Sequence, residues 1–211
     1  TIKLFKVCTL RHIPIFTFVN KMDREARDPF ELMENIEEIL GIKTYPMNWP
    51  ISCGKDFKGV YDRSAKRVLA FSSDGRANGV KMVDEVEAEL GDAALDELIG
   101  TANHEKLAED IELLDGAAEE FDLEAVQHGE LSPVFFGSAL TNFGVEPFLK
   151  EFLRLTPAPL PRKDAASGEL VDPCSEQFSG FVFKIQANMN KNHRDRIAFL
   201  RICSGKFERG M

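Results

Sequence analysis

The chain has 211 residues, 44% of them apolar, and a formal net charge of −9. That length allows one sizeable core, or one domain and part of another. The sequence contains no apolar run long enough to span a membrane and no signal peptide. Its four cysteines show no CxxC spacing of the kind that binds zinc. We therefore expect a cytoplasmic protein with free thiols, and no membrane span or zinc site.

The charge is unevenly distributed. From Phe178 to the end there are seven Lys/Arg and two Asp/Glu, whereas residues 1–177 carry 19 basic and 33 acidic side chains. An acidic body followed by a basic extension predicts that any contact with a polyanion involves the extension. The alternative is a basic surface that is merely solvated.

The first predicted elements are a helix and a buried strand. Residues 2–11 space their apolar positions as an amphipathic helix. The run Ile13–Val19 is almost wholly apolar, which predicts a strand buried on both faces of a parallel sheet. It ends in Asn20-Lys21-Met22-Asp23, at the carboxyl end of the strand, where open α/β sheets bind ligands.

The pattern N-K-x-D suits recognition of a guanine base. The Asp23 carboxylate can accept from N1–H and N2–H of guanine together, and charge-assisted bidentate bonds of this kind are strong. Adenine lacks that pair of donors and would leave the carboxylate unpaired. Asn20 can meet O6 or N7 or tie loops together, and the Lys21 stem can lie flat on the base. The alternative is a solvated turn in which Asp23 caps a helix.

A helix and an insertion follow the motif. Asp28-Pro29 is a good helix start, and Gly41 is a good stop. Residues 44–128 are predicted to be an insertion in the α/β domain. It begins with short strands, including a hairpin, and continues as an acidic segment. We expect helices in that segment near 92–99, 103–114 and 122–127. Its acidic side chains are expected to be solvated, with a partner interface as the alternative.

The second half of the chain repeats the strand-and-loop pattern and then changes character. Val134–Phe136 is predicted to be a second buried strand, followed by Gly137-Ser138-Ala139-Leu140 and a helix over Val145–Leu155. Four prolines and many small or charged residues predict a linker over residues 157–177. From Phe178 the pattern predicts two strands, 178–186 and 197–203, joined by a polar loop.

Asn20-Lys21-Met22-Asp23 after one strand and Gly137-Ser138-Ala139-Leu140 after the next resemble the fourth and fifth guanine-nucleotide motifs of translational GTPases. In that family the serine and alanine of the second motif help to hold the base, the alanine through its backbone N–H to O6. Five longer stretches of the sequence resemble the release factor 3 family of bacteria. These stretches are residues 9–25, 48–62, 132–149, 157–162 and 178–211.

The resemblance implies an α/β fold class, namely the second part of a P-loop-type GTPase domain over residues 1–156. This domain has a mostly parallel sheet, flanking helices and the inserted subdomain. The linker and the first strands of an all-β barrel, residues 178–211, follow it. It also implies a set of residues that bind GTP and GDP: Asn20, Lys21, Asp23, Ser138, Ala139 and Leu140.

The same family acts on the ribosome after peptide release and promotes departure of the class I release factor with GTP hydrolysis. The barrel touches the small subunit, so the loop residues Lys191, His193, Arg194 and Arg196 are candidates for contacts with rRNA phosphates. Alternatively, these basic side chains form ion pairs with Asp195 and neighbouring acidic residues. The alternative functions are an elongation factor G-type GTPase and a non-enzymatic ribosome- or RNA-binding module.

A phosphate site is missing from the sequence. GTP hydrolysis needs a cradle of the type G-x-x-x-x-G-K-S/T, Mg²⁺ ligands and a positioned water, and no such cradle occurs. We therefore expect a fragment that begins after the first three nucleotide motifs, with no nameable catalytic residue and no metal ligand. It should bind GTP or GDP weakly, leave Mg²⁺ binding and hydrolysis to the full-length protein, and self-associate through an exposed sheet edge.

Overall fold

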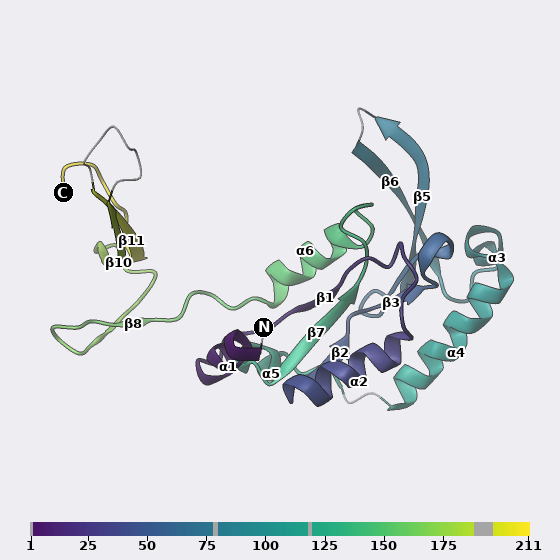
Figure 1. Ribbon diagram of the computed structural model, residues 1–211, viewed down its shortest axis with the longest axis horizontal. Coiled ribbons are helices and arrows are strands. Elements are labelled where there is room, and N and C mark those ends of the chain that lie inside the picture. Colours follow the sequence, from purple (N-terminus) through teal and green to yellow (C-terminus); the bar gives the residue numbers. More distant parts are fainter. Residues whose placement is uncertain (1, 78–79, 118–119, 188–195) are drawn as a thin grey trace. The chain divides into compact units, whose positions relative to one another are not determined.

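The computed structural model describes residues 2–77, 80–117, 120–187 and 196–211 (Figure 1). They form two compact units, Thr1–Thr156 and Pro157–Met211, and each is described by itself. No helix within the described ranges is both long and apolar enough to cross a membrane.

A three-stranded parallel sheet is the centre of the first unit. Its strand order is β1 (Thr17–Val19), β7 (Leu131–Phe136) and β2 (Lys43–Pro46), and both outer strands run parallel to β7. All six residues of β7 are buried, as expected for the middle strand of a covered parallel sheet. The sequence pattern predicts a shorter strand here, beginning at Val134.

The first strand differs from its prediction. A strand buried on both faces was expected over Ile13–Val19, but β1 covers only Thr17–Val19 and is half-buried, and the Ile13 side chain is 42% exposed. Among the described residues β7 is the only strand beside β1. An edge strand with one neighbour is less covered than a central strand, so the buried strand of this sheet is β7.

Alternate residues of β7 face two different apolar clusters. Phe135 packs with Phe148 of α6 (Val145–Leu155), with ring centroids 5.0 Å apart. Val134 and Phe136 belong to the other cluster, which includes Trp49 and half-buried Phe30 of α2 (Pro29–Leu40). The two-residue period of the strand therefore directs its side chains to two faces, each covered by a helix.

The helix predicted after the N-K-M-D motif is confirmed, together with its caps. Phe30 N donates to Asp28 Oδ1 at 2.9 Å at the start of α2, and Gly41 ends it in the left-handed region with φ 68°. Three further helices of this unit match their predicted positions: α6 (Val145–Leu155) with the same bounds, and α1 (Ile2–Leu10) and α5 (Leu123–His128) to within one residue at each end.

A four-stranded antiparallel sheet lies between β2 and α5 in the sequence. Its order is β3 (Asn48–Ile51), β4 (Gly59–Asp62), β5 (Arg67–Ala77) and β6 (Val80–Glu89). The β4–β5 hairpin confirms the predicted one, whereas β6 falls in a stretch for which no strand was expected. The 3₁₀ helix η1 (Gly54–Asp56) joins β3 to β4, and α3 (Ala94–Ile99) and α4 (Thr101–Ala117) follow β6.

The predicted start of the insertion, residue 44, is too early. Lys43–Pro46 pairs with β7 and is the third strand of the parallel sheet, and the antiparallel sheet begins only at Asn48. A proline and an exposed first residue hid this short strand from the sequence pattern.

The second unit consists of two hairpins. The predicted linker contains the short pair β8 (Arg162–Lys163) and β9 (Leu170–Val171). The two predicted strands are confirmed as β10 (Ser179–Ala187) and β11 (Arg196–Ser204), which pair in antiparallel fashion.

Candidate functional site

The loops that follow β1 and β7 lie side by side, because these strands are parallel neighbours. The backbone ladder continues beyond the strand ends. Gly137 N donates to Val19 O at 3.0 Å, and Met22 N donates to Gly137 O at 3.1 Å. The two predicted motifs therefore meet at the carboxyl edge of the sheet, where α/β folds bind ligands.

Two hydrogen bonds join the side chains and backbone of these loops. Ser138 Oγ donates to Asp23 Oδ1 at 2.6 Å, and Ala139 N donates to Asn20 Oδ1 at 2.9 Å. The same Asn20 oxygen also accepts from Lys21 N at 2.7 Å. Of the roles left open for Asn20, its carboxamide oxygen ties the loops together here.

The remaining predicted residues face outward. Lys21 and Ala139 are exposed, and Leu140 is 78% exposed. Lys21 has a φ of 71°, in the left-handed region that side chains other than glycine rarely adopt. The next residue, Met22, is 1% exposed and belongs to the core. The left-handed residue thus lies where the loop changes from exposed to buried, and a strained backbone of this kind persists only where surrounding contacts hold it.

Gly137 allows the two loops to approach. A Cβ at this position would lie 2.5 Å from Phe143 O and 2.8 Å from Cζ of Phe18. No larger residue fits without moving the backbone of the following turn. The glycine of G-S-A-L is therefore required by close packing.

The turn between β3 and β4 supports the loop that follows β1. The sequence did not predict this contact. Gly54 N donates to Met22 O at 2.8 Å and to Arg24 O at 3.1 Å. Its φ is 67°, and a Cβ would lie 2.8 Å from Oε1 of Glu25. An isolated glycine between polar residues is only a weak turn signal, and it does not say which loop the turn contacts.

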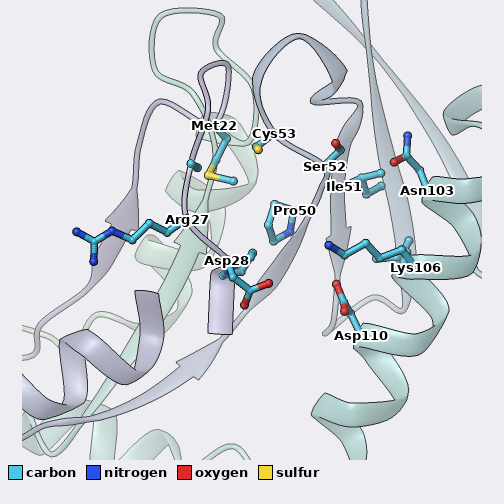
Figure 2. Close-up of a pocket in the computed structure, with 13 residues that line it drawn as sticks. Met22, Arg27, Asp28, Pro50, Ile51, Ser52, Cys53, Asn103, Lys106 and Asp110 are labelled. Carbon is cyan, nitrogen blue, oxygen red and sulfur yellow. The ribbon is translucent and has the colours of Figure 1, made fainter. Parts of the chain in front are cut away.

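A cavity of about 260 Å³ lies beside the loops but is not formed by their outward-facing residues (Figure 2). Met22 is the only residue of N-K-M-D that lines it. Figure 2 shows Met22 and Cys53 at one end and Lys106 and Asp110 of α4 across from them. Asp110 Oδ2 accepts from Nε1 of Trp49 at 2.9 Å. In the part of the chain that the structure describes, no three His, Cys, Asp or Glu side chains gather as metal ligands.

The candidate rRNA-binding residues fall mostly outside the described residues. Lys191, His193 and Arg194 belong to the segment 188–195, which the structure does not describe. Arg196 is the first residue of β11 and is exposed.

Two family models match the chain. The Elongation factor Tu GTP binding domain matches residues 1–158, and Elongation factor G domain 2 matches residues 177–211. The chain belongs to the translational GTPases. The α/β fold class followed by a β-rich domain is thereby confirmed, and the two motif loops lie within the part that matches the GTP-binding domain.

Several relatives of this translational GTPase are named Peptide chain release factor 3, which agrees with the resemblance found in the sequence. The one from Symbiobacterium thermophilum is 56% identical over 211 residues, covering 100% of this chain and 39% of that protein. Those from Ligilactobacillus salivarius and Gloeobacter violaceus are 51% and 50% identical, with the same coverage. The chain therefore spans about 39% of the length of these relatives.

A crystal structure of a protein from Thermus thermophilus has the same fold. Its TM-score is 0.58 at 22% identity, and the match covers 99% of this chain and 30% of that one.

Proposed function

We propose that this chain recognises the guanine base of GTP and GDP through Asn20, Lys21, Asp23, Ser138, Ala139 and Leu140. The observation that carries the proposal is the pair of hydrogen bonds, Ser138 to Asp23 and Ala139 to Asn20, that joins the loops at one sheet edge. The chain's membership of the translational GTPases supports it.

Each residue has a role that follows from its position. Asp23 accepts from N1–H and N2–H of guanine, and the hydroxyl of Ser138 orients its carboxylate. The Ala139 N–H donates to O6 of guanine. Binding of the base therefore replaces the hydrogen bond that Ala139 N now donates to Asn20 Oδ1. The exposed Lys21 stem and the Leu140 side chain supply apolar contact with the base.

Phosphate binding and hydrolysis belong, in this proposal, to other parts of the complete protein. No G-x-x-x-x-G-K-S/T pattern occurs in the 211 residues. Mg²⁺ would act at that phosphate site. The chain by itself is therefore proposed to bind GTP and GDP weakly and to leave GTP unhydrolysed.

The complete protein is proposed to act in translation termination, because the relatives over the whole chain are named Peptide chain release factor 3. It would hydrolyse GTP on the ribosome and promote dissociation of a class I release factor. Its place of action would be the cytoplasm, where ribosomes translate. The basic side chains Lys191, His193, Arg194 and Arg196 would contact rRNA of the small subunit.

An elongation factor G-type function is the second candidate, because the model of Elongation factor G domain 2 matches residues 177–211. One assay separates the two. Ribosomes that carry a class I release factor after peptide release are mixed with the complete protein and GTP, and dissociation of the factor is timed. Acceleration supports termination. If the factor stays bound while tRNA translocation is accelerated, the elongation function is correct.

We also propose that the chain alone self-associates through the outer edge of β1. This strand has one neighbour in the described residues, and unpaired strand edges template association. Sedimentation velocity over a range of concentrations tests this, and a monomer at every concentration would exclude it.

A further inference from the structure

The strand β3 begins where one chain segment passes from the parallel to the antiparallel sheet. Pro46 ends β2, and Met47 N still donates to Val134 O of β7 at 2.9 Å. The next residue, Asn48, pairs instead with Asp62 of β4. The backbone of this segment therefore leaves β7 before β7 itself ends at Phe136.

The side chain of Asn48 takes the place of the missing backbone neighbour. Its Nδ2 donates to Phe136 O at 3.1 Å, and its Oδ1 accepts from Phe136 N at 2.7 Å. Asn48 is 4% exposed and Phe136 is fully buried. A carboxamide offers one donor and one acceptor side by side, as a backbone strand does, so both interior backbone groups are paired.

Phe136 is the last residue before the Gly137-Ser138-Ala139 loop. On the other side of the strand, Gly137 N donates to Val19 O of β1. The end of β7 is thus held by β1 on one side and by the Asn48 side chain on the other. The packing around the Phe136 carbonyl is tight, because a Cβ on Gly144 would lie 2.9 Å from Phe136 O.

We propose that Asn48 is a positioning residue for guanine recognition: through Phe136 it sets the exit of β7 and hence the place of Ser138 and Ala139. This inference rests on the proposed function of those residues with Asp23. It makes the inserted antiparallel sheet a support of the base loop, so that movement of β3 changes affinity for the base.

The test uses the complete protein and compares the affinities for GDP and IDP. Inosine lacks the 2-amino group, so the preference for GDP over IDP reports how well Asp23 reaches N2–H. Asn48→Ala is expected to weaken GDP binding about tenfold, corresponding to about 1.4 kcal/mol, and to reduce the preference for GDP. A change that merely destabilises the fold would lower the active fraction and leave the preference intact.

Asn48→Asp provides a second readout within one folded variant. The protonated acid has the shape of the amide and offers a donor and an acceptor, whereas the ionised form places negative charge against Phe136 O. GDP affinity of this variant, relative to that of the unaltered protein, should rise as the pH falls from 7.5 to 5.5. Asn48→Ala should show no such rise.

Ser132→Ala is the matched control. Ser132 is also buried on β7, but at the other end of the strand, where its Oγ shares a 2.8 Å hydrogen bond with Oγ1 of Thr17. This control should lower stability and keep the preference for GDP. If both Asn48 variants keep the GDP affinity and preference of the unaltered protein, the inference is wrong.

The proposed function fails in a different way. If the unaltered protein does not prefer GDP to IDP, or if Asp23→Ala keeps that preference, guanine recognition by these loops is excluded. If those two results are as expected and only the Asn48 variants are unaffected, the positioning role alone is excluded. If Asn48→Ala does not fold, the pH response of Asn48→Asp decides.

Discussion

Ser138 donates a 2.6 Å hydrogen bond to the carboxylate of Asp23 across a separation of 115 positions in the sequence. The serine is fully buried and the aspartate half-buried, so the bond lies at the inner side of the loops. A carboxylate that is oriented before the ligand arrives loses less conformational freedom on binding. This bond is the physical reason to expect a preformed base site in the free protein.

Ser138→Ala should weaken GDP binding by the complete protein roughly tenfold. A hydrogen bond to a charged group contributes about 1.5–3 kcal/mol, and solvent replaces part of it at a half-exposed carboxylate. Isothermal titration calorimetry measures the change. Ser64→Ala, which removes a hydroxyl bonded to Asp62 in the turn between β4 and β5, should leave affinity unchanged. Equal affinities for both variants would assign the Ser138 bond to the fold alone.

The 211-residue chain on its own should bind GDP far more weakly than a complete translational GTPase. Charge-assisted hydrogen bonds contribute roughly 1.5–3 kcal/mol each, so the loss of several phosphate contacts and Mg²⁺ exceeds ~5 kcal/mol. Affinity should then fall by a factor of thousands or more. A calorimetric titration that gave micromolar GDP affinity for the chain alone would contradict this.

The stability of the first unit should depend on the protonation of His104. Its Nδ1 lies 2.9 Å from Asp96 Oδ1 and its Nε2 lies 2.7 Å from Leu90 O. Two acceptors face the two ring nitrogens, so the charged imidazolium, with two donors, is favoured. The hydrogen bond to Asp96, then that to the Leu90 carbonyl, raise the pKa of His104 above its ordinary value of 6.5.

Because the folded pKa is the higher one, this stabilisation is complete below pH 6.5 and is lost as the pH rises through the folded pKa. Urea unfolding from pH 5.5 to 8.5, followed by fluorescence of the single tryptophan, Trp49, measures it. The free energy of unfolding should decrease with pH in this range, and His104→Gln should reduce the slope. An identical slope for that variant would show that other groups cause it. His128→Gln is the control on an exposed helix end, where Nδ1 lies 2.9 Å from the Glu124 carbonyl oxygen.

Sequence patterns identified the fold where local chemistry decides it. The start of α2 at Asp28-Pro29 and its end at Gly41 follow from capping, and they are found as predicted. The strand β6 was missed because half of its residues, VKMVDEVEAE, are charged and most of these are acidic, a composition that is uncommon in strands. Here pairing with β5 outweighs that low propensity.

The candidate site likewise combines residues that local patterns predict with residues whose role depends on tertiary packing. Asn20, Asp23, Ser138 and Ala139 could be proposed because strand ends and short motifs are local features, and parallel strands bring their carboxyl ends together. The residues that hold these loops in place could not be predicted from the sequence in the same way. Which strand an amide such as Asn48 faces depends on tertiary packing, and its only signal is a polar residue within the largely apolar run Tyr45–Ile51.

Arg194→Ala together with Arg196→Ala should weaken ribosome binding by the complete protein and reduce its salt dependence. Each phosphate contact releases counterions, so losing two should decrease the slope of log affinity against log salt by about 2. Filter binding at several KCl concentrations measures it. The double variant Arg162→Ala with Lys163→Ala, on the short β8 strand, is a control of equal charge. An unchanged slope for the Arg194/Arg196 variant would favour a structural role for those side chains.

Recognition of the base by Asp23 is the central element of the proposed function. The decisive measurement is the affinity of Asp23→Asn, in the complete protein, for GDP and for xanthosine diphosphate. An amide at this position offers a donor to the guanine N2–H donor but suits the xanthine carbonyl. We predict that GDP affinity falls at least about tenfold and that xanthosine diphosphate binds better than to the unaltered protein. Unchanged affinity for GDP would show that Asp23 does not contact the base and would contradict the proposed function.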